Sequence, residues 1–233
     1  MPRALASVPI GSPLLVIDAE SQDATVEIAR AHGATVVVRP WAGFVTTRSF
    51  ALTHVATPWT FMLDADESLD FELAAVLRAL EPAEMTDAYG FARATSICGR
   101  AMHHGAWGGE APVRLFRTAR ARVVAEPASG GDAEVHEHWI VPGTTERLGG
   151  TLLHDSYPTI RAYREKFARY TALEARGVAP SRGRLARACA VAALRFPWLL
   201  LARGGWRDGW RGVFVAGASA CYPVAVAWKS IRS

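Results

Sequence analysis

The 233-residue sequence contains few cysteines and no long uninterrupted apolar run. Its three cysteines, Cys98, Cys189 and Cys221, are odd in number and include no CxxC pair, which argues against a disulfide framework and a zinc knuckle. No stretch has the roughly 18 uninterrupted apolar residues of a membrane-spanning helix, so the sequence predicts that the chain is not a polytopic membrane protein. The first ten residues also lack the apolar core of a signal peptide. Together these absences predict a protein of the cytoplasm.

Lysine is nearly absent, and basic charge is concentrated in one part of the chain. Residues 1–160 contain 12 arginines, no lysine and 19 Asp or Glu, which gives a net charge of −7. Residues 161–211 contain 12 Lys or Arg and three acids, which gives +9. This asymmetry favours an anionic partner for the basic segment, either nucleic acid or a membrane surface, although a solvated helix surface has the same composition.

Apolar periodicity predicts alternating strands and helices in the first 90 residues. The predicted strands cover residues 14–17, 35–38 and 59–63, and the predicted helices cover 24–32, 46–56 and 71–80. This order is typical of a parallel sheet covered by helices. Shorter strands follow at 89–94 and 113–116, separated by a Gly-rich loop at 105–109. We therefore expect an α/β fold with a mostly parallel sheet and helices on both faces.

The chain beyond residue 158 is predicted to be helical. A basic amphipathic helix begins near Ile160, and two apolar stretches follow at residues 186–202 and 213–228. The first is interrupted by Arg195 and Pro197, and the second by Pro223. We therefore expect two domains, an α/β domain over residues 1–157 and a basic C-terminal region of amphipathic helices over residues 158–233.

Carboxylates follow the third predicted strand. Asp64 and Asp66 come directly after the apolar residues 61–63, and the carboxyl ends of parallel strands open onto the crevice where ligands bind. Two carboxylates at this spacing can share Mg²⁺, which typically uses one or two carboxylates plus substrate phosphates. The pattern predicts a metal-bound phosphate ester; the alternative is an Asp-rich cap on a helix whose first turn is residues 68–70.

A second polar group follows the first predicted strand. Asp18, Ser21 and Asp23 lie where a strand ends and a helix begins. Free backbone N–H groups at that helix terminus, together with these side chains, are suited to hold the ribose or base of a nucleotide. A simple capping sequence is the alternative.

Several motifs in register resemble the family 2 glycosyltransferases, in particular the branch similar to lipopolysaccharide core β-glucosyltransferases. The resemblance runs from about residue 14 to the C-terminus. The motifs are residues 18–25, Trp41-Ala42-Gly43-Phe44, residues 59–67 ending in Asp64-Ala65-Asp66-Glu67, the segment from Trp107 through Glu110 to Arg114-Leu115-Phe116, Val135-His136-Glu137, Leu153-His154, and Gly205-Trp206-Arg207-Asp208-Gly209.

The resemblance implies the A-type, Rossmann-like fold of nucleotide-diphospho-sugar transferases. It also implies an inverting transfer of a hexose from a nucleoside-diphosphate sugar, such as a UDP-sugar, to a lipid-linked or lipopolysaccharide-core glycan, in a single displacement. Asp66, with help from Asp64, would hold Mg²⁺ or Mn²⁺ against the diphosphate and so offset charge on the leaving group.

The resemblance also implies roles for other residues. Asp18, Ser21 and Asp23 would contact the nucleoside. Glu110 is the expected general base for the acceptor hydroxyl, and Glu137 is the second choice. The remaining expected substrate-binding positions are Arg48, Trp107, Arg114, His136 and His154. His136 and His138 could instead belong to a zinc site, for which the third ligand would have to be His103, His104 or His154.

The N-terminus departs from the family pattern. The resemblance implies a strand and a helix before the motif at residue 18, whereas only 17 residues precede Asp18. Residues 4–10 are expected to form a short strand at most, because a parallel crossover needs about a dozen residues or more. The sequence thus predicts an N-terminally shortened fold.

The C-terminal region interleaves arginine and tryptophan with apolar residues. Such a pattern is typical of a helix that lies in the lipid headgroup layer. Nucleic acid would use the same charges but would leave the apolar stretches without a role. We therefore expect peripheral attachment to the inner, anionic face of the cytoplasmic membrane and no nucleic-acid partner. Packing of these helices on the α/β domain is the alternative.

Two other functions are compatible with parts of the sequence. Residues 61–66 resemble the nucleophile strand of haloacid-dehalogenase-like phosphatases, although Glu67-Ser68 follows where those enzymes have Gly-Thr. A degenerate, non-catalytic transferase fold at the membrane would fit the short N-terminus.

Overall fold

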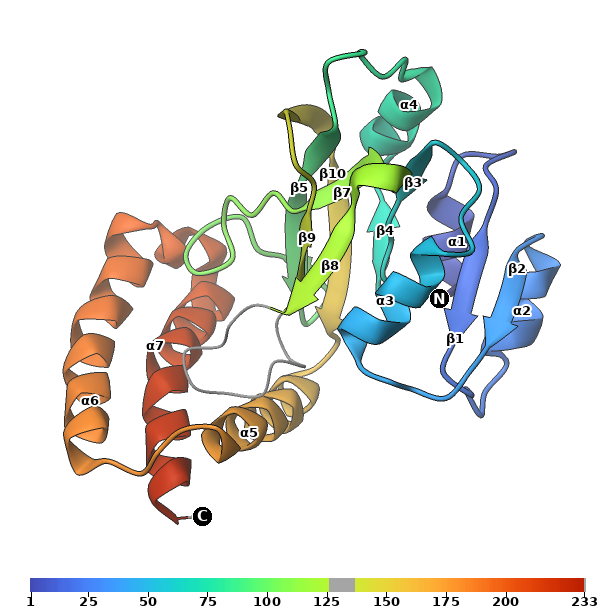
Figure 1. The fold of residues 1–233 in the computed structure, drawn as a ribbon. Helices are drawn as coiled ribbons and strands as arrows, with labels where there is room; N and C mark the ends of the chain where they lie inside the picture. The colour runs from blue at the N-terminus through green and yellow to red at the C-terminus, as the bar shows by residue number, and fades with distance from the viewer. Residues whose placement is uncertain (126–136, 233) are drawn as a thin grey trace. The chain divides into compact units, whose positions relative to one another are not determined.

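The computed structural model of the protein describes residues 1–125 and 137–232 (Figure 1). These residues form two compact units. The first unit comprises residues 1–93, 111–125 and 137–154, and the second comprises residues 94–110 and 155–232. Both β5 (Ala88–Ile97) and β10 (Thr145–Tyr157) contain a boundary between the units. At these two places the division falls within strands, whereas the boundary between Glu110 and Ala111 lies in the loop before residue 113.

The first unit begins with a small parallel sheet. Helix α1 (Pro2–Ser7) precedes β1 (Leu15–Asp18), and α2 (Thr25–Ala31) connects β1 to β2 (Thr35–Val38). The β-branched residues of β2 favour an extended backbone. Leu5, Ala29 and Ala34 are buried together, so α1 and α2 share one small core with this sheet.

A larger sheet of six strands forms the rest of the first unit and extends into residues 94–101. Its order is β3, β7, β5, β10, β4, with β6 paired to β5. The remaining bounds are β3 Trp59–Phe61, β4 Glu67–Leu69, β6 Arg100–Ala101 and β7 Val113–Arg117. The pairs β3–β7, β5–β7, β5–β6 and β10–β4 are antiparallel. A 3₁₀ turn (Thr118–Arg120) then leads to a separate antiparallel ribbon of β8 (Arg122–Ala125) and β9 (Glu137–Ile140).

Two further helices complete the first unit, α3 (Phe44–Leu52) and α4 (Phe71–Ala79). The carboxylate of Asp70 accepts a hydrogen bond from the Leu73 N–H at 2.7 Å and so caps α4. Leu73 is fully buried in a core with Phe91 of β5 and Leu152 of β10. Gly150 of β10 has a φ of +83°, and a Cβ atom at this position would lie 2.4 Å from the Leu73 nitrogen. The close packing of α4 on β10 therefore requires glycine at position 150.

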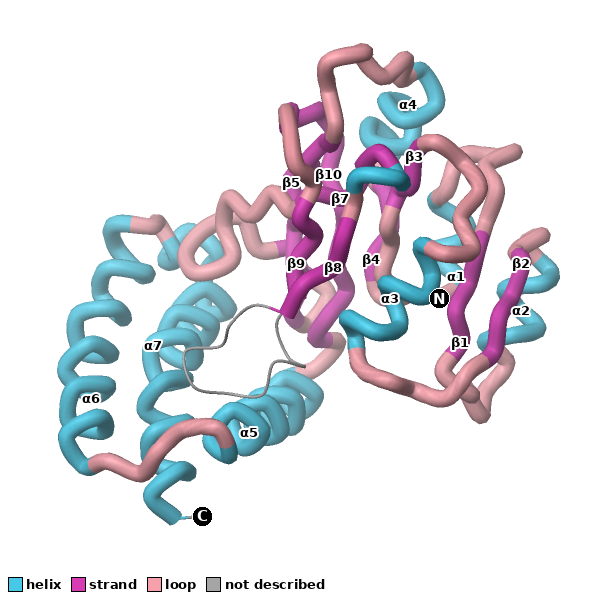
Figure 2. Tube along the Cα trace, viewed as in Figure 1, coloured by secondary structure: helices cyan, strands magenta, loops and turns pink. Residues whose placement is uncertain are grey.

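The second unit is mainly helical, as Figure 2 shows for the chain beyond residue 160. It contains α5 (Ile160–Arg176), α6 (Arg182–Pro197), a π-helical turn (Trp198–Ala202), a 3₁₀ turn (Gly205–Asp208) and α7 (Gly209–Arg232). Tyr163 of α5 and Val215 of α7 are buried with Ile97 and Met102. Residues 94–110 are thus packed against the C-terminal helices.

The α/β class expected from the sequence is confirmed, but the sheet is mixed and not mostly parallel. In the described part of the chain, helices separate strands only in the first 80 residues. Among the described residues, β5 to β10 follow one another without an intervening α-helix. Short connections favour antiparallel pairing, because parallel strands need a long crossover.

Two local predictions are wrong. Residues 68–70, expected as the first turn of a helix, belong to β4 and to the cap of α4. Residues 4–10, expected to be a short strand at most, begin within α1, where Pro2 occupies the first helical turn and alanine and leucine follow. Alanine and leucine have high helix propensity, and proline is favoured at a helix start.

Two helical segments are long and apolar enough to cross a membrane by length and composition alone. They are residues 182–202, whose most apolar part is 6% buried, and residues 205–232, whose most apolar part is 33% buried. The sequence prediction counted only uninterrupted apolar runs and therefore did not find these segments. Their mean hydropathy is high enough for a membrane-spanning helix although single charges such as Arg195 interrupt them. Composition by itself does not exclude membrane-spanning helices here.

Gly150→Ala tests the packing of α4 on β10. We expect the change to lower the free energy of unfolding by about 2–4 kcal/mol, since it adds backbone strain and a steric overlap with Leu73. The measurement is urea denaturation. Gly33→Ala is the control, because Gly33 has a similar φ of +79° but no neighbouring atom within 4 Å of the place that an alanine Cβ would take. It should cost only about 1 kcal/mol. Equal losses for the two variants would contradict the packing argument.

Candidate functional site

The strand order brings the acids at residues 64–67 beside charged residues of three other strands. β3 and β4 lie at opposite ends of the order β3, β7, β5, β10, β4, and only residues 62–66 connect them. This connection must pass the strands in between. Its acids accordingly contact Arg114 of β7 and His154 of β10. Glu67, the first residue of β4, lies near Arg93 of β5.

Asp64 is held by two arginines. One carboxylate oxygen accepts from Arg48 Nη2 of α3 at 2.7 Å, and the other accepts from Arg114 Nη2 at 3.0 Å. The Asp64 backbone N–H also donates to Glu67 Oε2 at 3.2 Å. The carboxylate of Asp64 is therefore fixed in orientation and balanced by positive charge.

Glu67 is a buried carboxylate that the sequence alone did not single out. It is 1% exposed and accepts from Arg114 Nη2 at 2.6 Å, while Arg93 Nη1 lies 3.7 Å away. Its position in β4, and not in a helix, directs the side chain inward. Glu67 was visible in the sequence as the last residue of the Asp-Ala-Asp-Glu tetrad. Its burial could be predicted only if residues 67–69 were recognised as a strand.

Arg114 joins the two acids. Burial alone would lower the pKa of its guanidinium, but the Asp64 and Glu67 carboxylates outweigh this effect and raise the pKa above its ordinary value. The side chain is only 6% exposed. Its Nη1 also lies 3.0 Å from the Met62 sulfur, whereas its buried Nε has no hydrogen-bond partner within the described part of the chain.

Asp66 is the more accessible of the two expected metal ligands. Its side chain is 45% exposed, and Oδ2 lies 3.3 Å from His154 Nε2. His154 pairs with Glu67 in the β10–β4 register, which explains why the imidazole reaches this edge. The structure thus brings together five of the expected site residues, namely Arg48, Asp64, Asp66, Arg114 and His154.

Asp18, Ser21 and Asp23 form a separate polar group where β1 ends. Asp18 is buried, and its carboxylate accepts from the Ser21 N–H at 2.9 Å. Hydrogen bonds from the Thr25 hydroxyl and, next, from its backbone N–H hold the pKa of the exposed Asp23 carboxyl below its ordinary value. Asp18 therefore shapes the turn, while Ser21 and Asp23 remain at the surface.

Trp107 and Glu110 belong to the second unit. The Trp107 ring is stacked on Tyr157 with centroids 5.3 Å apart, and Glu110 is half-buried at the end of the Gly-rich loop. Glu137 is the first residue of β9, but its side chain lies outside the described part, as does all of His136.

The acids at residues 64–66 fit a divalent cation that is held largely by a diphosphate. In the part of the chain that the structure describes, no group of three or more His, Cys, Asp or Glu could hold a metal ion on its own. Mg²⁺ typically binds through only one or two carboxylates plus phosphate oxygens and water. Asp66 fits this role better than Asp64, both of whose oxygens accept from arginine. The same described residues give no zinc site.

Comparison with known protein families gives a match that covers the residues of this arrangement. The model for "Glycosyl transferase family 2" matches residues 13–169, a region that contains all of these acids. The string 61–66 lies inside this region, so we set aside the phosphatase interpretation.

Three similar proteins are all named uncharacterized glycosyltransferase. The protein from Rickettsia bellii is 42% identical over 88 residues, 37% of this chain and 30% of that protein. The Rickettsia prowazekii protein is 40% identical over 88 residues, again 37% of this chain and 30% of that protein. A Mycobacterium tuberculosis protein is 39% identical over 70 residues, 30% of this chain and 32% of that protein. The matched stretches therefore cover less than a third of these relatives. Because the family model spans well over half of the chain, the chain belongs to glycosyl transferase family 2.

Proposed function

We propose that the protein transfers a hexose from a UDP-sugar to a lipid-linked or lipopolysaccharide-core glycan, as in the lipopolysaccharide core β-glucosyltransferase-like branch of the family. The mechanism is a single displacement that inverts the anomeric centre. The main support is the group of Asp64, Asp66 and His154 at one edge of the sheet, in a chain that belongs to family 2.

On the donor side, Asp18, Ser21 and Asp23 contact the nucleoside, and Arg48 and His154 lie at the diphosphate. Asp66, assisted by Asp64, would hold Mg²⁺ or Mn²⁺, and such a cation would offset charge on the leaving diphosphate. Arg114 is buried and bonded to both Asp64 and Glu67. It therefore acts by fixing Asp64 and does not itself contact the donor.

On the acceptor side, Glu110 removes the proton of the attacking hydroxyl, and Trp107 and His136 bind the acceptor. Glu137 is the second candidate for the base. A general base of this kind contributes about 10²–10⁴-fold to the rate. We propose that residues 1–157 carry this chemistry and that residues 158–233 contact the membrane where a lipid-linked acceptor is found.

The outer surface of the second unit supports membrane attachment. Large apolar side chains are exposed at several positions there, with Leu194 at 75% and Trp206 at 58%. The others are Val191, Trp198, Leu201, Trp210, Val213, Trp228 and Ile231. Residues 182–203 contain five arginines and no acid. Apolar exposure combined with positive charge is complementary to an anionic bilayer surface.

Each tryptophan in this region has a guanidinium over its ring. The distances from the arginine Cζ to the ring centroid range from 4.4 to 5.8 Å. The pairs are Trp198 with Arg203, Trp206 with Arg207, Trp210 with Arg211, and Trp228 with Arg232. Tryptophan and arginine are both enriched where a helix meets the headgroup layer, because each combines an apolar body with a polar group.

The contacts of α7 favour a position on the surface over one that spans the bilayer. Lys229, near its C-terminal end, donates to the Ala168 carbonyl and the Thr171 hydroxyl of α5, both at 2.7 Å. Phe214, near its other end, packs edge-on against Tyr163 of α5. A helix packed along a charged helix over this length cannot be surrounded by hydrocarbon without burying those charges. We therefore propose peripheral attachment to the cytoplasmic face of the membrane.

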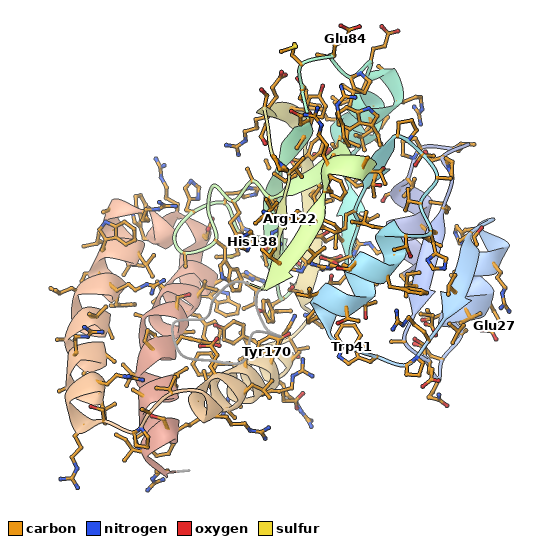
Figure 3. The ribbon with its side chains drawn as sticks, viewed as in Figure 1. Glu27, Trp41, Glu84, Arg122, His138 and Tyr170 are labelled. Carbon is orange, nitrogen blue, oxygen red and sulfur yellow. The ribbon has the colours of Figure 1, made fainter. Side chains whose placement is uncertain are left out.

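The donor site is tested by binding of UDP with Mn²⁺. We expect UDP–Mn²⁺ to raise the melting temperature of the wild-type protein, with a stabilisation of about 2.7 kcal/mol at 100 times Kd. Asp66→Ala should lose most of this shift. Glu27→Ala is the control, because Glu27 is exposed on α2 (Figure 3). If no nucleoside diphosphate shifts the wild-type melting temperature, the transferase proposal fails.

Glu110→Gln tests the general base. We expect kcat for sugar transfer to fall by about 10²–10⁴-fold, whereas the UDP–Mn²⁺ thermal shift is retained because the nucleotide contacts lie in the first unit. The assay is release of UDP in the presence of membrane extract as a source of acceptor. Glu137→Gln is measured in parallel, and a large loss in that variant alone would assign the base to Glu137.

Flotation with vesicles tests membrane attachment. Replacing Trp198, Trp206 and Trp210 together by serine should weaken binding to vesicles that contain about one third phosphatidylglycerol by at least about 10-fold, since three interfacial anchors are lost. Trp41→Ser is the matched control, because Trp41 is an exposed tryptophan of the first unit (Figure 3). Equal binding of the triple variant and the wild type would count against this surface.

A further inference from the structure

The turn between α6 and α7 is hydrogen-bonded to a segment of the same unit that lies about a hundred residues earlier in the sequence. We call residues 203–211, which include the first residues of α7, the inter-helix turn, and residues 98–110 the Gly-rich segment. The Gly105 N–H donates to the Arg203 carbonyl, and Arg203 Nη2 donates to the Gly108 carbonyl, both at 2.9 Å. Arg211 donates to the carbonyls of Ile97 and Cys98 at 3.1 Å. The turn therefore binds the Gly-rich segment along its length.

Asp208 makes the central contacts between the two. Its Oδ2 accepts from the backbone N–H groups of His103 at 3.2 Å and His104 at 2.9 Å, and its Oδ1 lies 3.1 Å from His104 Nδ1. The side chain is 8% exposed. An aspartate directly before a helix usually caps that helix. Here both of its oxygens are instead directed at the Gly-rich segment.

Glycines allow the two backbones to approach closely. A Cβ at Gly105 would lie 3.1 Å from the Gly205 Cα, and Gly105 has a φ of +70°. Within the C-terminal part, a Cβ at Gly212 of α7 would lie 1.8 Å from the Gly205 carbonyl oxygen, so glycine at position 212 lets α7 pack on the turn. Larger residues at these positions would move the turn away and lengthen the Asp208 hydrogen bonds. The packing thus requires this particular arrangement of small residues and one carboxylate.

The Gly-rich segment is the part of the chain that contains Trp107 and Glu110. We propose that Asp208 is a positioning residue for the transfer reaction, and that it acts by fixing the backbone of residues 103–105 and hence the place of the Glu110 carboxylate. This inference rests on the proposed function for the role of Glu110. The contacts of Asp208 themselves do not depend on it.

The same turn lies within the surface proposed to contact the membrane. Trp206 and Trp210, on either side of Asp208 in sequence, are both more than half exposed. The residue that fixes the Gly-rich segment is therefore flanked by two of the proposed membrane anchors. The inter-helix turn would therefore have two roles. It would position the general base for the acceptor, and it would attach the protein to the membrane that contains the acceptor.

The test compares Asp208→Ala with Asp208→Asn in the full chain. Amide hydrogen exchange is measured by mass spectrometry for peptides covering residues 99–110. In Asp208→Ala we expect exchange of the 103–105 amides to be at least about 10-fold faster. Asp208→Asn should restore much of the protection, because the asparagine carbonyl can still accept from an N–H. Glu165→Ala is the control, since Glu165 is an exposed acid of α5 paired locally with Arg161.

Carboxyl footprinting reports on Glu110 directly. Labelling with a carbodiimide and glycine ethyl ester should change at least about 2-fold at Glu110 in Asp208→Ala, with Glu27 as an internal reference. The UDP–Mn²⁺ thermal shift should be unchanged, because the donor group lies in the first unit. In the UDP-release assay, kcat should fall about 10-fold with an unchanged KM for the donor, as expected when only the base is misplaced.

Four outcomes separate the possibilities. Faster exchange confined to the Gly-rich segment, with rescue by asparagine, supports the proposal. Unchanged exchange in Asp208→Ala overturns it, and so does faster exchange throughout α6 and α7 in both variants, which would give Asp208 a purely structural role. Failure of the wild type to bind UDP–Mn²⁺ would refute the proposed function while leaving the exchange result interpretable.

Discussion

The buried pair of Glu67 and Arg114 is the interaction on which the rest of the first unit depends. Removing a carboxylate and a guanidinium from water is costly, and only a well-bonded partner offsets that cost. The pair joins β4 to β7, which are not neighbours in the sheet. Because Arg114 also binds Asp64, the same pair fixes the orientation of the first acid of the Asp-Ala-Asp motif. Stability and arrangement of the site therefore have a common origin.

The sequence predicted the elements that show strong local patterns. The strand at residues 35–38 has the expected bounds, the helix expected over residues 71–80 is present as Phe71–Ala79, and Asp64 and Asp66 were correctly expected beyond the end of a strand. β4 was missed because three residues are too few to show a period of two. The contact between Arg48 and Asp64 was also not foreseen, since long-range pairing depends on strand order, which local patterns do not encode.

The C-terminal helices show a different limit of sequence interpretation. Hydropathy describes what surrounds a helix on average, whereas the environment of α7 is set by its individual neighbours. One side of α7 contacts α5, and other positions such as Trp210 and Trp228 are exposed. The arginines that interrupt the apolar stretches are, in part, structural: Arg203 and Arg211 bind backbone carbonyls of the Gly-rich segment and of Ile97 before it. The positive charge of these arginines in the sequence did not indicate that they bind backbone carbonyls.

The passage of residues 62–66 across the strands has a consequence for the order of folding. Asp64 and Arg114 are 50 residues apart in sequence, and Asp66 and His154 are farther apart still. Contacts of such long range form only after the chain between them has been ordered, since loop closure costs entropy before it is repaid. We therefore expect the proposed nucleotide site to be among the last parts of the first unit to assemble. A partly folded chain would lack it, so binding of donor would select molecules whose sheet is complete.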